Sequence, residues 1–262
     1  MTTLTVQTLA AIFGILGNIV SVGVFLSPVP TFYRIYKRKS SEGYKSLPYA
    51  VGLFSAMMLL YYGSLKPGGI LLITINSFGC FIEVIYLVIF LVYAPKESKY
   101  FTLKLILLFN LGACSLVMLL TTLLCKGSKR ITVVGWINAV INLCVFAAPM
   151  SIMRQVIKTR SVEFMPISLS LALTLNACMW FFYGFFLKDY FIAGPNILGF
   201  LLGIVQMTLY IFYKWCNSKI GQDSNHDETS KESNHDDTSQ DLKLQSVDNV
   251  IKDNQQVELQ IV

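Results

Sequence analysis

The sequence predicts an all-α membrane protein with seven transmembrane helices, arranged as two parallel three-helix repeats joined by a linker helix. Three observations lead to this prediction. The chain of 262 residues is 54% hydrophobic and only 14% charged, whereas soluble domains average about 25% charged residues. Seven apolar runs are long enough to cross a bilayer core as helices, which takes about 20 residues each. A unit of roughly 85 residues also occurs twice.

The seven apolar runs follow one another with short connections, as is usual in helix bundles. Their expected limits are 8–32, 45–64, 70–93, 101–124, 131–153, 166–187 and 191–213. They divide the chain into a first repeat (1–97), a linker helix (98–127), a second repeat (128–216) and a tail (217–262). One odd span between two three-helix units lets both units cross the membrane in the same direction, so we expect parallel repeats.

Matched tyrosine–glycine pairs and matched asparagines define the repeat. Tyr62 and the following glycine end one apolar run, and Asn76 opens the next. Tyr183, its following glycine and Asn196 do the same in the second copy, and a glycine comes three residues after each asparagine. Such repetition of long apolar runs is typical of transporters built from structural repeats.

Four prolines also occupy matched places. Pro28 and Pro149 lie late in the first helix of each repeat, and Pro48 and Pro166 lie at the start of the second. A proline inside a helix removes a backbone hydrogen bond and produces a kink, whereas a proline in a first turn is an ordinary helix start. The symmetric placement favours a set of four hinges toward the cytoplasmic side.

Charge is distributed unevenly along the chain. With the N-terminus outside, the cytoplasmic connections hold 13 Lys/Arg and the outer ones five. The positive-inside rule then predicts an extracellular N-terminus and a cytoplasmic C-terminus, although three basic residues after the fourth span oppose it. Residues 217–262 hold ten acidic residues and four lysines, which predicts a disordered acidic cytoplasmic tail. The net charge of +6 therefore does not indicate nucleic-acid binding.

Catalytic and metal chemistry is not expected. The six cysteines show no metal-binding or redox spacing and read as apolar packing residues. Both histidines lie in the tail, so no nucleophile–base pair can be assembled within the spans, and we predict no enzyme activity, metal or cofactor. Glu83 is the one acidic residue inside the spans, and Gly203 takes its matched place. An unmatched carboxylate leaves proton coupling open as an alternative.

Uncharged polar and aromatic side chains at matched depths are the candidate ligand-binding residues. Counting from the repeated motifs gives five pairs near the helix middles: Ser21/Asn142, Val24/Val145, Ser55/Asn176, Leu59/Trp180 and Asn76/Asn196. Amides donate and accept hydrogen bonds to sugar hydroxyls, and an indole stacks on the C–H face of a sugar ring. The same amides could instead join helix to helix within the bilayer. The pattern favours a neutral polyhydroxylated ligand.

Together these segments resemble the SWEET (MtN3/saliva) family of sugar transporters over about residues 8–214. The resemblance is carried by these motifs: Leu-Gly-Asn18, Leu-Ser-Pro28-Val-Pro-Thr-Phe, Ile-Asn76-Ser-Phe-Gly, Ala-Pro149-Met-Ser, Trp180-Phe-Phe-Tyr-Gly and Pro195-Asn196. It implies a plant protein of the plasma membrane that forms homo-oligomers and carries sugar passively by alternating access.

The resemblance also implies roles for single residues. Asn76, Asn196 and Trp180 would contact the sugar, and the four prolines would form the hinges. An extracellular gate would consist of Tyr62, Tyr183 and Asp189. Val24 and Val145 resemble the third-clade branch that exports sucrose, because small residues there leave room for a disaccharide.

Three positions depart from that branch. Leu59 replaces a frequent tryptophan, and Asn142 and Asn176 stand where serine is common. Sucrose efflux is the expected function, and a uniporter preferring glucose or fructose stays open. A proton-coupled transporter of the PQ-loop type would need titratable groups at the cavity. A seven-helix receptor would show no repeat.

Overall fold

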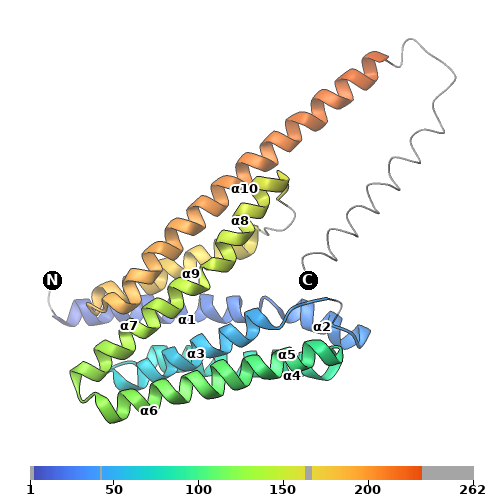
Figure 1. Cartoon of the computed structure of the whole chain (residues 1–262). Helices are drawn as coiled ribbons and strands as arrows, with labels where there is room; N and C mark the ends of the chain where they lie inside the picture. Colours follow the sequence, from blue (N-terminus) through green and yellow to red (C-terminus); the bar gives the residue numbers. More distant parts are fainter. Residues whose placement is uncertain (1–2, 42, 163–166, 232–262) are drawn as a thin grey trace. The chain divides into compact units, whose positions relative to one another are not determined.

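The computed structural model describes residues 3–41, 43–162 and 167–231, and every regular element among them is helical (Figure 1). The elements are α1 (Thr3–Leu26), α2 (Val29–Arg38), α3 (Leu47–Leu65), α4 (Ile70–Tyr93), α5 (Lys96–Leu105), η1 (Ile106–Ala113), α6 (Cys114–Leu124), α7 (Ser128–Val145), α8 (Ala147–Thr159), α9 (Ile167–Phe186) and α10 (Tyr190–Lys231). The described residues divide between Lys214 and Trp215 into two units. The helical bundle described below is the first.

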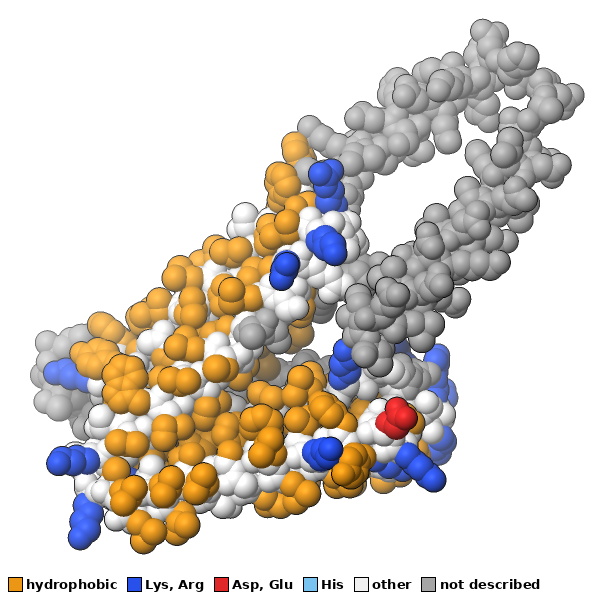
Figure 2. Space-filling model, viewed as in Figure 1, with side chains coloured by type: hydrophobic (Ala, Val, Ile, Leu, Met, Phe, Trp, Pro, Cys, Tyr) orange, Lys and Arg blue, Asp and Glu red, His pale blue; other side chains and the backbone are white. Residues whose placement is uncertain are grey.

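Seven segments are long and apolar enough to span a membrane, which confirms the prediction of seven transmembrane helices. They are Thr5–Arg38, Leu47–Leu65, Ile70–Tyr93, Lys96–Leu124, Ser128–Thr159, Ile167–Phe186 and Tyr190–Trp215. Large apolar side chains on their outer faces are exposed, for example Leu124 (77%) and Leu123 (66%). Figure 2 shows these side chains covering the flank of the bundle, with most lysines and arginines toward its ends. The protein is therefore a multi-pass membrane protein.

Three of the predicted spans need correction. The first and fifth spans are longer than expected and each is broken into two helices. The seventh helix continues to Lys231, so residues 217–231 are helical where we expected a disordered tail. This stretch contains no proline to end the helix that enters it. The remainder of the predicted tail, 232–262, lies outside the described residues.

The breaks in the first helix of each repeat lie near the matched prolines. Pro28 separates α1 from α2, and Tyr86 Oη donates a hydrogen bond of 2.8 Å to the carbonyl of Phe25 beside the break. In the second repeat the break comes at Phe146, three residues before Pro149. Loss of the helical N–H at each proline explains why the axis can bend there.

Of the other two prolines, only Pro48 lies among the described residues, and it stands at a helix start. Pro48 lies in the first turn of α3, where its missing N–H would have no helical partner. Pro166 lies outside the described residues.

The two repeats are built with the same glycine contacts. A Cβ added at Gly79 would lie 2.5 Å from Phe25 Cζ, and one at Gly199 would lie 3.0 Å from Phe146 Cζ. In each repeat, then, the third helix approaches the first so closely that a larger residue in place of the glycine would press on the phenylalanine ring. The pairing confirms the repeat read from the sequence.

Contacts between the repeats are made by α1 packing against α9 and by α3 packing against α7. The linker span packs on α3 through α5, η1 and α6. Its middle is a π-helical segment, which the sequence did not predict. Asn110 in that segment is 2% exposed, and its amide atoms have no hydrogen-bond partner in the described part of the chain.

Candidate functional site

A cavity of about 180 Å³ lies between the two repeats. Its lining comes from both repeats: Ser21, Val24, Phe25, Leu59, Leu72, Ile75, Asn76, Asn142, Asn176, Trp180, Phe191, Ile192, Pro195 and Asn196. The structure thus brings together eight of the ten ligand-binding residues predicted from the sequence. None of the lining side chains is charged, so the cavity suits a neutral ligand.

The two remaining predicted residues, Ser55 and Val145, do not line the cavity. Ser55 lies one helical turn beyond Leu59, and the cavity ends before that turn. Val145 is the last residue of α7 and is 39% exposed. α7 ends four residues before Pro149, whereas α1 ends two residues before Pro28. Counting back from the proline along an unbroken helix therefore misplaces the Val145 side chain.

Hydrogen bonds hold Trp180 against the first repeat. Its indole N–H donates to Ser21 Oγ at 3.0 Å, and Ser21 Oγ donates to Asn176 Oδ1 at 2.6 Å. The ring also meets Tyr183 edge-on, with centroids 5.2 Å apart. An indole fixed in this way presents a rigid apolar face to the cavity.

Three asparagines in the cavity share one arrangement. The Nδ2 atoms of Asn76 and Asn196 each donate to the carbonyl four residues earlier at 2.8 Å, and Asn142 does so at 2.9 Å. Each bond uses one of the two amide N–H groups and leaves the side-chain oxygen available. Each amide therefore keeps both a donor and an acceptor for a hydroxylated ligand.

Sequence reasoning missed six of the lining residues: Phe25, Leu72, Ile75, Phe191, Ile192 and Pro195. Four of them carried a usable signal. Leu72 and Ile192 lie four residues before Asn76 and Asn196, on the same helix face, and Ile75 and Pro195 directly precede these asparagines. Phe25 and Phe191 also line the cavity but do not stand at these spacings.

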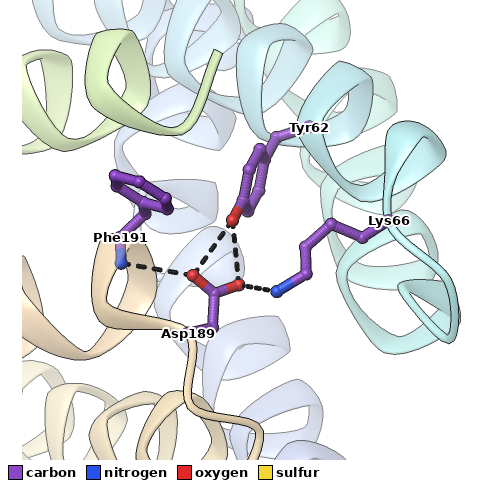
Figure 3. Close-up of polar contacts among 4 residues, drawn as sticks. All are labelled: Tyr62, Lys66, Asp189 and Phe191. Carbon is purple, nitrogen blue, oxygen red and sulfur yellow. Dashed lines mark hydrogen bonds and ion pairs between the residues drawn. The ribbon is translucent and has the colours of Figure 1, made fainter. Parts of the chain in front are cut away.

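Polar contacts around Asp189 lie next to Phe191 of the cavity wall (Figure 3). We call this end of the cavity the closed end. The carboxylate accepts hydrogen bonds from Tyr62 Oη, at 3.0 Å to each oxygen, and from the backbone N–H of Phe191 at 3.2 Å. It also forms an ion pair with Lys66. The Asp189 side chain is fully buried, and that of Lys66 is 20% exposed. These bonds join the first repeat to the second.

The sequence suggested Tyr62, Tyr183 and Asp189 for this end but not Lys66. Lys66 directly follows the last residue of α3, four positions after Tyr62. Tyr183 is 2% exposed and packs on Trp180, and none of its described contacts is a hydrogen bond to Asp189. It supports the cavity wall beside the closed end.

A second polar cluster joins the linker helix to both repeats. Arg130 donates to Tyr61 Oη from Nε at 3.0 Å and from Nη2 at 2.7 Å, and Nη2 also donates to Thr122 Oγ1 at 2.6 Å. Tyr61 Oη and Thr121 Oγ1 are 2.8 Å apart. Arg130 belongs to the basic group that opposed the predicted orientation, and its charge has this structural role.

Glu83 does not line the cavity. Its side chain lies between α3 and α4, with Oε1 2.7 Å from where a Cβ on Gly52 would be, and Oε2 has no described hydrogen-bond partner. In the second repeat the corresponding helix contact is made by Thr174 against Gly203. The carboxylate thus occupies a helix-packing position.

Comparisons with known proteins agree with this geometry. The family model described as a sugar efflux transporter for intercellular exchange (MtN3/saliva) matches residues 11–98 and again 132–218. The bidirectional sugar transporter NEC1 of Petunia hybrida is 62% identical over 87% of this chain and 84% of its own length. SWEET9 of Arabidopsis thaliana is 59% identical over 80% and 82%.

A third relative and a solved structure are also similar to this chain. SWEET11 of Arabidopsis thaliana is 55% identical over 82% of this chain and 74% of its own length. A eukaryotic SWEET transporter of known structure superposes with a TM-score of 0.77 at 34% identity, covering 80% of this chain and 99% of that one.

Proposed function

The chain belongs to the SWEET family of sugar transporters, and from this we propose that it is a bidirectional facilitative sugar transporter, and no enzyme, that exports sucrose across the plasma membrane. The observation that carries the proposal is the uncharged cavity between the repeats, with its asparagines and its fixed indole. Amides and an indole recognise hydroxyls and C–H faces without requiring charge on the ligand.

Transport would follow from the position of the cavity between two units that can move against each other. The sugar contacts Asn76, Asn196 and Trp180 while the Asp189 end is closed, and rocking of the repeats then opens that end and closes the other. A passive carrier must bind its sugar with similar affinity in both states. The breaks at Pro28 and Phe146 supply bending points in the first helix of each repeat.

Sucrose is favoured by Val24, a small side chain in the cavity wall. Two features favour a monosaccharide instead. Leu59 supplies an aliphatic wall where a second aromatic ring could stack, and the volume of about 180 Å³ is below the roughly 300–1,000 Å³ of typical ligand pockets. A disaccharide therefore requires the helices to separate from the present conformation.

We place the Asp189 end on the extracellular side and the C-terminus in the cytoplasm, as the lysine and arginine distribution favours. The domain limits that we propose are 1–97 and 128–216 for the repeats and 98–127 for the linker. The chain is expected to assemble as a homo-oligomer, since exposed apolar surface covers much of the bundle.

The test is the flux of radiolabelled sucrose and glucose, in both directions, in cells that express the wild type, Asn196→Ala or Asn18→Ala. Asn18 is a helix-bridging asparagine outside the cavity and is the matched control. We expect sucrose flux that is lost in Asn196→Ala and kept in Asn18→Ala. Glucose flux without sucrose flux would assign a monosaccharide carrier. No flux of either sugar, with the protein at the cell surface, would overturn the proposal.

A further inference from the structure

A second hollow, of about 570 Å³, lies between α7 and α10 beside the closed end. We call it the α7/α10 groove. Most of its lining is apolar or aromatic: Tyr62, Lys66, Ile131, Trp136, Ala139, Leu143, Lys188, Asp189, Tyr190, Phe191, Gly194 and Pro195. Phe191 and Pro195 also line the sugar cavity, so these two residues separate the two spaces.

Two side chains that fill the matched crevice of the first repeat are missing from the groove. There, Asn18 Nδ2 donates to the carbonyl of Leu71 at 3.0 Å, and Thr74 Oγ1 donates to Asn18 Oδ1 at 3.0 Å, which bridges α1 and α4. At the matched positions the second repeat has Ala139 and Gly194. A Cβ added at Gly194 would meet no atom within 4 Å.

The chemistry around the groove matches that of a phospholipid. Trp136 and Tyr190 are 63% and 74% exposed, and such aromatic residues gather at the level of lipid headgroups. Lys188 lines the groove, is exposed, and has no ion-pair partner among the described residues, whereas Lys66 is neutralised by Asp189. One free ammonium beside an apolar slot complements one phosphodiester beside an acyl chain.

We propose that the α7/α10 groove binds a glycerophospholipid, with an acyl chain along Trp136 and Leu143 and the phosphate at Lys188. The acyl chain would lie against Phe191. The Phe191 ring packs on Gly135 and meets the Trp136 ring edge-on, with ring centroids 5.4 Å apart. The backbone N–H of Phe191 binds Asp189. The bound lipid therefore braces the partition between membrane and sugar cavity, next to the closed end.

The test uses the fluorescence of Trp136 in the full chain, with Trp215→Phe to remove the other exposed indole. The protein is placed in nanodiscs of digalactosyldiacylglycerol that contain a minor fraction of a guest lipid with brominated, quenching acyl chains. The guest is either phosphatidylglycerol, which carries a phosphate, or brominated digalactosyldiacylglycerol, which carries none. Trp136→Phe in the same background supplies the blank.

We expect phosphatidylglycerol to quench Trp136 more strongly than the phosphate-free guest. Lys188→Gln should remove about a fivefold enrichment of the phosphate lipid, since one lysine near an anionic lipid contributes that much, and Lys188→Arg should restore it. Lys126→Gln, an exposed lysine outside the groove, is the control and should change nothing.

A second variant fills the α7/α10 groove with the side chains that occupy the matched crevice of the first repeat. Ala139→Asn with Gly194→Thr copies Asn18 and Thr74, and should reduce quenching by both guests. Equal quenching by both guests in the wild type, or quenching unaffected by Lys188→Gln, would overturn the proposal. So would a change of oligomeric state in the filled variant, seen by native mass spectrometry, with bound lipid unchanged, because the groove would then be a contact between copies of the chain.

Discussion

The ion pair at the closed end offers a quantitative test of alternating access. Asp189→Ala removes a fully buried carboxylate and leaves Lys66 and the Tyr62 hydroxyl without their partner. Breaking a buried ion pair in this way costs about 3–5 kcal/mol. The bonds join the two repeats, and alternating access would break them when this end opens. A loss of about 3 kcal/mol should therefore shift the closed–open equilibrium by a factor on the order of 100 toward the open state.

Double electron–electron resonance between two spin labels would measure this shift as a change in distance. Spin labels on Ser64 and Tyr190, both exposed near the closed end, are introduced after the native cysteines are replaced. We expect a longer distance population to dominate in Asp189→Ala. Tyr62→Phe removes hydrogen bonds to the carboxylate but keeps the ion pair, so a smaller shift of about tenfold is expected. Lys126→Gln serves as the control, and the reasoning fails if Asp189→Ala leaves the distances unchanged.

Three further predictions follow from side-chain contacts. Trp180→Phe keeps the aromatic face but loses the N–H bond that orients it, so the KM of sugar uptake should rise about 2- to 10-fold, and an unchanged KM would contradict this role. Gly79→Ala should lower the melting temperature more than Gly199→Ala, because its Cβ meets a phenylalanine ring at 2.5 Å rather than 3.0 Å and overpacking costs about 1–3 kcal/mol; the reverse order would refute the packing argument. Arg130→Ala should lower the melting temperature and Arg130→Lys should restore it only in part, because both Nε and Nη2 donate; full rescue by lysine would show that charge alone matters.

The sequence predicted the spans and most of the cavity for an identifiable physical reason. Helical periodicity and the repeat together place Asn76, Asn196 and Trp180 at one depth on facing helices, and the structure brings them to one cavity. Val145 was misplaced because the helix break in the second repeat comes earlier than its proline suggests. Pro149 marks the neighbourhood of this break, but the residue at which the helix ends also depends on tertiary packing.

Long side chains and missing side chains were harder to foresee. Lys66 and Arg130 reach across helices to partners that are distant in sequence, and their positions alone suggest only charged loop residues. The α7/α10 groove arises where Ala139 and Gly194 are small. An absence of atoms becomes meaningful only when the neighbouring helix is in place.

Sucrose counterflow with the purified protein in proteoliposomes tests the central claim most directly. Vesicles loaded with unlabelled sucrose are diluted into labelled sucrose, with and without an imposed pH gradient. A passive uniporter whose cavity contains no titratable side chain predicts accumulation of label that is the same under both conditions and absent in Asn196→Ala. Accumulation that requires the pH gradient, or none with any sugar, would contradict a facilitative sugar transporter.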